Sequence, residues 1–180
     1  MSRAFIDEDS EHQDELPDIP QSHFPGYITP EGFARLSSEL NDLRDRELPP
    51  LLAEVEEGGP SATEAEITIA RIEQRARYLN ARLERAIVLD PATSTHDHVH
   101  FGAFVTTRDQ NGHEMRVQIV GEDETDPDGG RVSWVSPLAK ALVNKKIGEK
   151  AVWHRPIGDL ELEIVKIEQT VASSSAAESE

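Results

Sequence analysis

The sequence contains no cysteine, which excludes a disulfide framework and thiolate chemistry. Aromatic residues make up only 5% of the chain and hydrophobic residues 37%, so any globular core must be modest. No segment approaches the roughly 20 consecutive apolar residues that span a bilayer, and the acidic N-terminus lacks the apolar core of a signal peptide. We therefore expect a soluble, cytoplasmic protein of one or two small domains with no membrane partner.

Positive charge is also scarce. The 180 residues carry 18 Lys and Arg against 35 Asp and Glu, for a net charge of −17. This balance argues against a broad duplex-DNA interface, which requires basic residues to neutralise phosphates. Much of the acidity lies in the first 25 residues, which are also rich in proline and polar residues. We predict that residues 1–26 and 169–180 are disordered, solvated tails.

Residues after the first tail show the spacing of an amphipathic helix. It begins at Thr29, which can cap it, and at Pro30, which suits the first helical position. Its apolar stripe follows spacings of three and four and consists of Phe33, Leu36, Leu40 and Leu43. Pro49-Pro50 predicts an interruption, because proline lacks the N–H that a helix interior needs.

A second helix follows a short link of two glycines, a proline and a serine at residues 58–61. Ser61 and Glu64 match a capping box, in which each side chain accepts a hydrogen bond from the backbone of the other. The helix ends before Pro91, and its seam consists of Ile69, Ile72, Ala76, Leu79, Leu83 and Ala86. Two such helices on a short link must lie antiparallel to bury their stripes, which predicts a coiled-coil hairpin over residues 27–91.

Residues 101–168 change to segments rich in strand-forming residues. Asn111-Gly112 lies between the first two and indicates a β-hairpin. Ser136-Pro137 opens a short helix, with serine as the cap. The predicted fold is therefore α+β: the helical hairpin, a linker at residues 92–100, and a mostly antiparallel sheet domain with one short helix.

Several stretches in combination carry a resemblance to a known family. They are FGAFVTT, RVQIVGEDETDP, VSWVSPLAKALVNKKIGEKAVWHRP and GDLELEIVKIE in the sheet segment, and ITPEGFARLSSEL and RARYLNARLERAIVLD in the helices. Residues 27–168 resemble the GreA/GreB family of bacterial transcript-cleavage factors, and the second helix is closer to the GreB type. The resemblance implies an FKBP-like sheet domain that binds RNA polymerase at the rim of its secondary channel, and a hairpin that enters the channel. It also implies a monomeric transcription elongation factor that is accessory to the polymerase and not itself an enzyme.

The hairpin tip departs from the family pattern. Family members carry Gly-Asp-x-x-Glu-Asn-Ala, whose carboxylates help to hold a second Mg²⁺, a cation that prefers carboxylate and water oxygens. With Gly59 matched to the family glycine, Pro60 and Thr63 replace the two acids. The match of both arms without gaps predicts a tip shorter by roughly one heptad, or about 5 Å per arm.

The tip is therefore expected to have lost its catalytic residues, and Glu64 and Glu66 remain near it as the candidates that could replace them. The alternative is that both are solvated charges at a helix end, with Glu64 as a capping partner. We expect no stably bound cofactor; if cleavage is retained, the relevant metal is the Mg²⁺ of the polymerase active site.

The family's polymerase-binding element reads [Asp/Asn]-Ser-Pro-x-Ala-Arg, and valine replaces its first residue here. The candidate polymerase-binding residues are Val135, Ser136, Pro137, Leu138 and Lys140. The alternative for the Ser-Pro pair is a helix cap and nothing more.

Arginines recur along the second helix. The family carries a basic patch near the RNA 3′ end, which makes Arg71 and Arg75 candidate RNA contacts, since guanidinium suits phosphate. The alternative is that these and the neighbouring arginines form exposed pairs with Glu73 and Glu84.

Three histidines alternate in the predicted linker. In a strand His96, His98 and His100 would face the same side and could hold Zn²⁺, Ni²⁺ or Cu²⁺, whereas a solvated linker needs no metal. Two other function classes stay open. One is a binding module resembling the nucleoside diphosphate kinase regulators. The other is an FKBP-type prolyl isomerase, which would need an apolar pocket built from Phe101, Phe104, Trp134 and Trp153.

Overall fold

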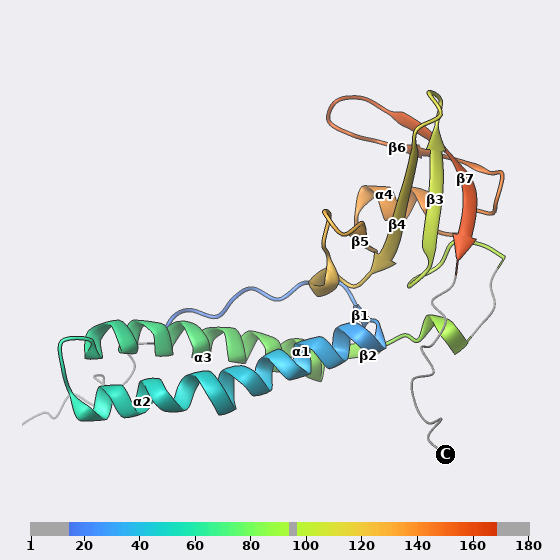
Figure 1. Cartoon of the computed structure of the whole chain (residues 1–180). Coiled ribbons are helices and arrows are strands. Elements are labelled where there is room, and N and C mark those ends of the chain that lie inside the picture. The colour runs from blue at the N-terminus through green and yellow to red at the C-terminus, as the bar shows by residue number, and fades with distance from the viewer. Residues whose placement is uncertain (1–14, 94–96, 169–180) are drawn as a thin grey trace, which may run out of the picture. The chain divides into compact units, whose positions relative to one another are not determined.

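The computed structural model describes residues 15–93 and 97–168 (Figure 1). These residues form two compact units. The hairpin unit contains residues 15–23 and Arg35–Arg85, and the sheet unit contains Phe24–Ala34 and the described residues from Ala86 onward. The predicted C-terminal tail and the first 14 residues lie outside the described ranges, whereas residues 15–26 have a defined conformation. No helix within these ranges is long and apolar enough to cross a membrane.

The hairpin unit consists of two helical arms. The first arm comprises α1 (Pro30–Asp42), a π-helical turn (Leu43–Glu47) and α2 (Leu48–Glu57), and the second arm is α3 (Ala62–Glu84). The part of α1 that precedes Arg35 belongs to the sheet unit. Figure 1 shows α2 and α3 running side by side in opposite directions, which confirms the predicted helical hairpin.

The predicted apolar stripes form the core of this unit. Its buried apolar side chains are Leu36, Leu40 and Leu43 from the first arm, and Ala65, Ile72, Ala76 and Leu79 from α3. They lie on one face of each arm because residues three and four apart are neighbours on a helix surface. The coiled-coil description of this packing stays a prediction.

The two prolines interrupt the regular α-helical winding of the first arm, as predicted. Pro49 and Pro50 occupy the first turn of α2, the part of a helix in which proline is best tolerated. The preceding turn widens to π-helical geometry, and the Leu48 N–H donates to the Leu43 carbonyl five residues back. The arm therefore continues past the prolines by changing its local winding.

Two predictions at the ends of α3 are wrong. The Ser61 side chain makes no capping hydrogen bond, because its backbone is already helical (φ −93°, ψ −7°) and the capping box needs an extended residue there. At the other end, α3 stops at Glu84, and Ala86 lies in a strand instead of the helical seam. The hydrogen bonds of the strand decide the conformation of this segment, although the spacing of its apolar residues fits a helix.

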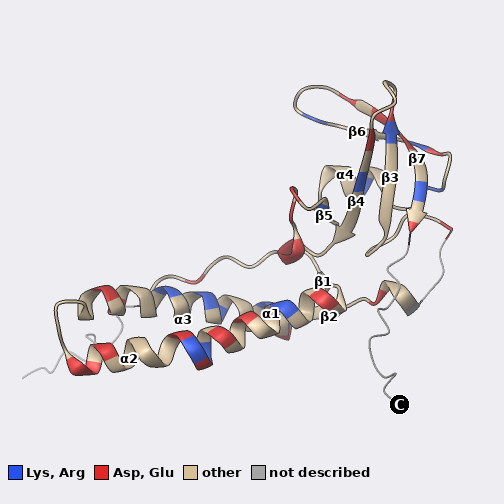
Figure 2. Cartoon of the chain, in the orientation of Figure 1, with Lys and Arg blue, Asp and Glu red and all other residues tan. Residues whose placement is uncertain are grey.

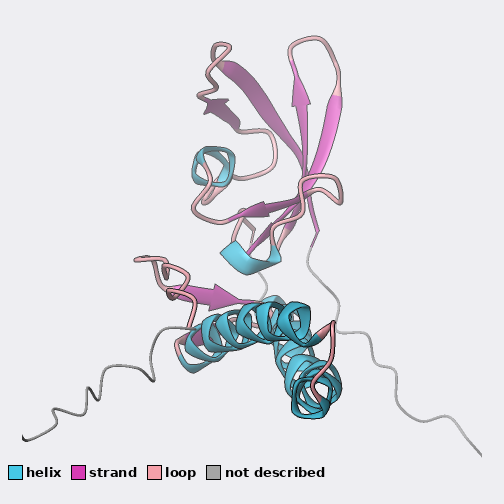
Figure 3. Cartoon of the chain, turned by 90° about the vertical axis from the view of Figure 1, so that its left-hand side faces the viewer, coloured by secondary structure: helices cyan, strands magenta, loops and turns pink. Residues whose placement is uncertain are grey.

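The sheet unit contains a five-stranded mixed sheet in the order β5-β4-β3-β7-β6, with the short helix α4 (Pro137–Leu142) beside it (Figure 3). Its strands are β3 (Phe104–Asp109), β4 (Glu114–Val120), β5 (Arg131–Ser133), β6 (Lys150–Trp153) and β7 (Leu160–Glu168). All neighbours are antiparallel except β4 and β5, which are parallel. The α+β class and the hairpin at Asn111-Gly112 are confirmed, and Gly112 takes the left-handed conformation that such a turn needs (φ 85°).

A second, two-stranded sheet was not expected from the sequence. β1 (Gly26–Ile28) pairs in parallel with β2 (Ala86–Val88), so the residues that bracket the helical arms meet inside the sheet unit. The Leu89 N–H also donates to the Ile28 carbonyl at 2.9 Å. This pairing fixes the point at which the first arm starts.

One buried carboxylate holds the first residues of α1 in the sheet unit. Glu124, only 3% exposed, accepts hydrogen bonds from the Thr29 N–H and the Gly121 N–H, both at 3.0 Å, and from the Thr29 hydroxyl. The Thr29 Oγ1 in turn accepts from the Gly32 N–H at 3.0 Å, which confirms Thr29 as the predicted cap. A Cβ on Gly32 would lie 2.2 Å from the Glu124 carboxyl group, so glycine is needed for the close approach.

We predict that Glu124→Ala lowers the free energy of unfolding by about 3 kcal/mol, because the buried Thr29 and Gly121 N–H groups lose a charged acceptor. Gly32→Ala should also destabilise, since its methyl group would displace the same carboxylate. Urea unfolding followed by circular dichroism measures both changes. The exposed Glu163→Ala is the matched control, with a change within about 0.5 kcal/mol. An equally small effect of Glu124→Ala would contradict the assignment.

Candidate functional site

The tip of the hairpin is a tight link at residues 58–61. Gly58 ends α2 with a positive φ of 63°, a conformation that favours glycine, and its N–H donates to the Val55 carbonyl. The Ala62 N–H donates to the Gly59 carbonyl at 3.2 Å and closes the turn into α3. Figure 2 shows acidic residues on both arms close to this link.

The two candidate catalytic glutamates lie on different faces of α3. Glu64 lines a cavity of about 200 Å³ together with Leu51 and Glu54 of α2, so it faces the first arm. Glu66 instead lines a hollow beside Leu16, away from that cavity. The separation follows from helix geometry, because residues two apart differ by about 200° around the axis. The structure therefore does not bring Glu64 and Glu66 to one site.

Glu64 instead shares the lining of its cavity with Glu54. The two residues are nearly equidistant from the centre of the link, and such positions face each other in an antiparallel hairpin. This signal was present in the sequence, in which Glu54 is one of five carboxylates near the tip, together with Glu56, Glu57, Glu64 and Glu66. Among the described residues, no group of three or more His, Cys, Asp or Glu side chains could hold a metal ion.

The predicted polymerase-binding element forms the start of α4. The Ser136 Oγ accepts a hydrogen bond from the Ala139 N–H at 3.1 Å, and Pro137 takes the first helical position, which confirms the predicted cap. Leu138 is buried, whereas Pro137 and Lys140 are exposed. The two exposed residues are therefore the ones that a partner can reach directly.

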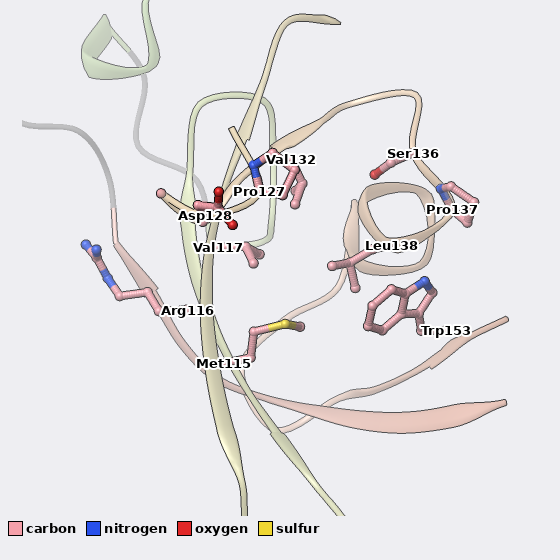
Figure 4. A pocket seen from close by; sticks show the side chains of 12 residues that line it. Met115, Arg116, Val117, Pro127, Asp128, Val132, Ser136, Pro137, Leu138 and Trp153 are labelled. Atoms are coloured by element: carbon pink, nitrogen blue, oxygen red, sulfur yellow. The ribbon is translucent and has the colours of Figure 1, made fainter. Parts of the chain in front are cut away.

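A cavity of about 640 Å³ opens beside this element (Figure 4). Met115 of β4, Leu138 of α4 and Trp153 of β6 contribute apolar lining, while Ser136 and Pro137 lie at one side. Of the four aromatic residues weighed for an isomerase pocket, Trp153 lines this cavity and Phe101, Phe104 and Trp134 do not.

An aromatic cluster lies around Trp134 in the same unit. Its ring centroid is 4.9 Å from that of Tyr27 and 6.0 Å from that of Phe24. The Lys140 Nζ lies 5.5 Å from the Phe24 ring centroid, within cation–π distance. Sequence reasoning missed this cluster because it placed Phe24 in a disordered tail.

The arginines of α3 have separate surroundings. The Arg75 Nε donates to the Glu39 Oε1 at 2.7 Å, and its guanidinium lies 5.3 Å from the Tyr78 ring centroid. Arg75 is therefore engaged with α1, whereas Arg71 is exposed and lines the hollow that also contains Glu66. The two candidate RNA contacts differ in accessibility.

The described part of the segment that contains the three histidines, residues 97–100, is hydrogen-bonded to other residues of the sheet unit. The Val99 N–H donates to the Lys145 carbonyl at 2.8 Å, and His98 forms an antiparallel bridge with Lys146. Hydrogen bonds from Lys146 and then His98 lower the pKa of Asp97 to about 2. His96 lies outside the described residues.

His98 and His100 lie on the same side of this segment, as their alternation predicts. Their ring centroids are 6.4 Å apart, and the Nδ1 atom of each ring already has an oxygen neighbour. The Nδ1 of His98 is 3.1 Å from the Asp97 Oδ1, and that of His100 is 3.0 Å from the His98 carbonyl. A metal would have to displace these contacts or use the other ring nitrogens.

We predict that the protein has no tight stoichiometric Zn²⁺ site, because a stable site needs ligands that a second layer of hydrogen bonds orients towards one point. Isothermal titration calorimetry of the full chain with Zn²⁺ should give only weak binding, and His98→Ala should leave the titration unchanged. One tight site that disappears in His98→Ala would overturn the prediction, and His154→Ala is the control for surface histidine binding.

Comparison with known proteins gives a consistent assignment. The family model "Transcription elongation factor, GreA/GreB, C-term" matches residues 94–169. The transcription elongation factor GreB of Neisseria meningitidis serogroup B is 36% identical over 151 residues, which cover 79% of this chain and 93% of that protein. GreA of Thermodesulfovibrio yellowstonii is 36% identical over 149 residues, which cover 78% of this chain and 94% of that protein.

Among solved structures, the GreA factor homolog 1 (Gfh1) of Thermus thermophilus is 27% identical to this protein. The match covers 79% of this chain and 97% of the Gfh1 chain, with a TM-score of 0.37. Both sequence relatives are 36% identical over more than two thirds of this chain. The chain therefore belongs to the GreA/GreB family of transcription elongation factors.

Proposed function

We propose that this protein binds RNA polymerase through its sheet unit, places its hairpin in the secondary channel, and stimulates transcript cleavage weakly or not at all. The observation that carries the proposal is the position of the acids at the tip. The candidate pair, Glu64 and Glu66, is divided between two faces of α3, and the link itself offers Pro60 and no carboxylate.

Assisted cleavage demands accurate placement of carboxylates. Hydrolysis by two metal ions requires carboxylate oxygens close to the position of the second Mg²⁺. A misplacement of about 1 Å can cost on the order of 10²-fold in rate. Two glutamates that point in different directions do not meet this requirement, and the shortening expected from the sequence would hold either of them further back. The protein then acts by occupying the channel.

The partner and the orientation rest on family membership together with local features. Relatives named GreB and GreA are transcription elongation factors, which makes RNA polymerase the partner. The exposed Pro137 and Lys140 would contact the rim of the channel. Near the RNA 3′ end, Arg71 is the candidate contact, because Arg75 is engaged with Glu39. The protein would act as a monomer and would need no cofactor of its own.

We predict that the protein fails to accelerate cleavage in a stalled elongation complex that contains backtracked RNA. In the same assay, it should slow cleavage induced by a competent GreB, since both would compete for one channel. The rate of release of the 3′ fragment measures both effects. The Glu64→Ala/Glu66→Ala variant should behave like the natural protein.

The shared cavity of Glu54 and Glu64 supplies a second comparison. Suppose that the natural protein cleaves robustly, that Glu54→Ala/Glu64→Ala removes the activity, and that Glu66→Ala does not. Glu54 and Glu64 would then have taken over the role of the family's acidic pair, and the proposal would fail. Loss of activity in the Glu64→Ala/Glu66→Ala variant alone would also defeat it.

We predict that Val135→Asn tightens binding to core RNA polymerase, because it restores the polar residue that the family carries before Ser-Pro. Lys140→Glu should weaken binding by at least about tenfold through reversal of an exposed charge. Fluorescence anisotropy with labelled polymerase measures both affinities. Lys166→Glu, on β7, is the matched control, and equal losses from the two lysine variants would show that overall charge and not this element governs binding.

A further inference from the structure

An aromatic ring from the N-terminal region lies against the exposed lysine of the predicted polymerase-binding element. The ring centroid of Phe24 is 5.5 Å from the Lys140 Nζ, and Phe24 is 46% exposed. Both residues belong to the sheet unit, in which Phe24 precedes β1 and Lys140 lies in α4. A partner that binds the start of α4 would therefore meet a lysine that already has an aromatic neighbour.

The Phe24 ring is held by other aromatic residues of the sheet unit. It packs edge-on against Trp134, with the centroids 6.0 Å apart and the ring planes at 78°, an arrangement that aromatic pairs favour. Trp134 also packs against Tyr27 of β1 at 4.9 Å, and its backbone N–H donates to the Val120 carbonyl at 2.9 Å. Phe24 is thus anchored to β1 and to the end of β4, and its ring is a fixed feature of the surface.

Lys140, by contrast, has little else to orient it. No acidic side chain of the described residues forms an ion pair with Lys140, whose side chain is exposed. A lysine is a point charge on a flexible stem, whereas the arginine of the family pattern presents a planar, pre-organised group. A free lysine therefore loses much rotamer freedom when a partner binds it. Attraction between the ammonium and the face of a fixed ring reduces this loss, because it restricts the side chain before binding.

The contact leaves the ammonium able to bind a partner. An ammonium has three N–H donors and no acceptor, and the ring does not neutralise its charge. The group that fits the remaining donors is a carboxylate, which would gain a charge-assisted hydrogen bond. The Phe24–Lys140 pair is therefore suited to an acidic protein surface.

We propose that Phe24 is a positioning residue of the polymerase-binding element, whose ring holds the Lys140 ammonium in place for a carboxylate on the polymerase. This inference rests on the proposed function, in which Lys140 contacts the rim of the secondary channel. The ring acts through the lysine, and its value to binding is the order that it imposes on that side chain. A cation–π contact at an exposed site corresponds to about two- to fivefold in affinity.

A double-mutant cycle on the full chain measures this coupling. Phe24→Leu should weaken binding to core RNA polymerase by about two- to fivefold in the anisotropy assay. Lys140→Met should weaken it further, because it removes the charge itself, and Phe24→Leu should then have no additional effect. Phe24→Tyr keeps a ring and should bind like the natural protein. Phe104→Leu, which removes the ring 4.1 Å from the Arg116 guanidinium, is the matched control and should leave the affinity unchanged.

A second measurement tests the pair without polymerase. In a proton–carbon NMR spectrum of protein labelled at the lysine Cε, the current of the nearby ring should shift the Lys140 Hε signal upfield. The signal is assigned by its disappearance in Lys140→Met. Phe24→Leu should move it towards the positions of the other lysine signals, whereas Phe104→Leu should not. Circular dichroism melting establishes that each variant remains folded.

The outcomes separate this inference from the proposed function. Unchanged affinity in Lys140→Met would overturn both, because the element would then not bind the polymerase as proposed. A loss in Lys140→Met with none in Phe24→Leu would overturn the role of Phe24 alone. The same loss from Phe24→Leu in the natural and Lys140→Met backgrounds would show that Phe24 acts independently of the lysine. A Lys140 signal that Phe24→Leu leaves in place would show that the ring does not hold the ammonium.

Discussion

The start of the helical arms depends on one buried carboxylate. Glu124 receives three donors from Thr29 and Gly121 without a basic partner beside it among the described hydrogen bonds, so the backbone and the hydroxyl must supply its stabilisation. The N-terminus of α1 contributes as well, because the partial positive charge of a helix start favours an anion nearby. Gly32 and Gly121 follow from this arrangement, since a side chain at either position would collide with the carboxylate or with the Tyr27 carbonyl. One acid thus constrains the identity of residues on two segments, at the start of α1 and directly before residues 122–124.

The parts of this fold that repeat regularly along the chain could be predicted from the sequence. Short strands and single buried polar residues could not. Stripes such as Leu36, Leu40 and Leu43 repeat often enough to specify a buried helix face. The three-residue strands β1 and β2 contain no complete period, and their pairing joins segments far apart in the chain. Ala86 matched the helical spacing by chance, and its strand bonds decide its conformation. Glu124 lies in an acidic loop sequence, where nothing marks one carboxylate as the buried one.

The candidate site shows the same division. The separation of Glu64 from Glu66 follows from their spacing on a helix and is predictable from the sequence alone. The caps at Thr29 and Ser136 were likewise readable, because each stands directly before a proline that opens a helix. The engagement of Arg75 with Glu39 and of Arg77 with Asp18 depends on which segment lies against α3. Charge patterns within the helix suggested neighbours on α3 itself, whereas the observed partners come from other segments.

The parallel pairing of β1 with β2 gives the two arms the topology of an insertion. The chain leaves the sheet unit after Ala34 and returns to it at Ala86, and the strands at the base of the two arms, β1 and β2, are paired in one small sheet. The entropic cost of closing a chain segment between two fixed ends rises only slowly with the length of the segment. Matched deletions from both arms would therefore shorten the reach of the hairpin without disturbing the five-stranded sheet. The length of the hairpin and the residues at its tip can therefore change in evolution while the sheet unit is conserved separately. Hairpin length is thus an adjustable trait of this architecture.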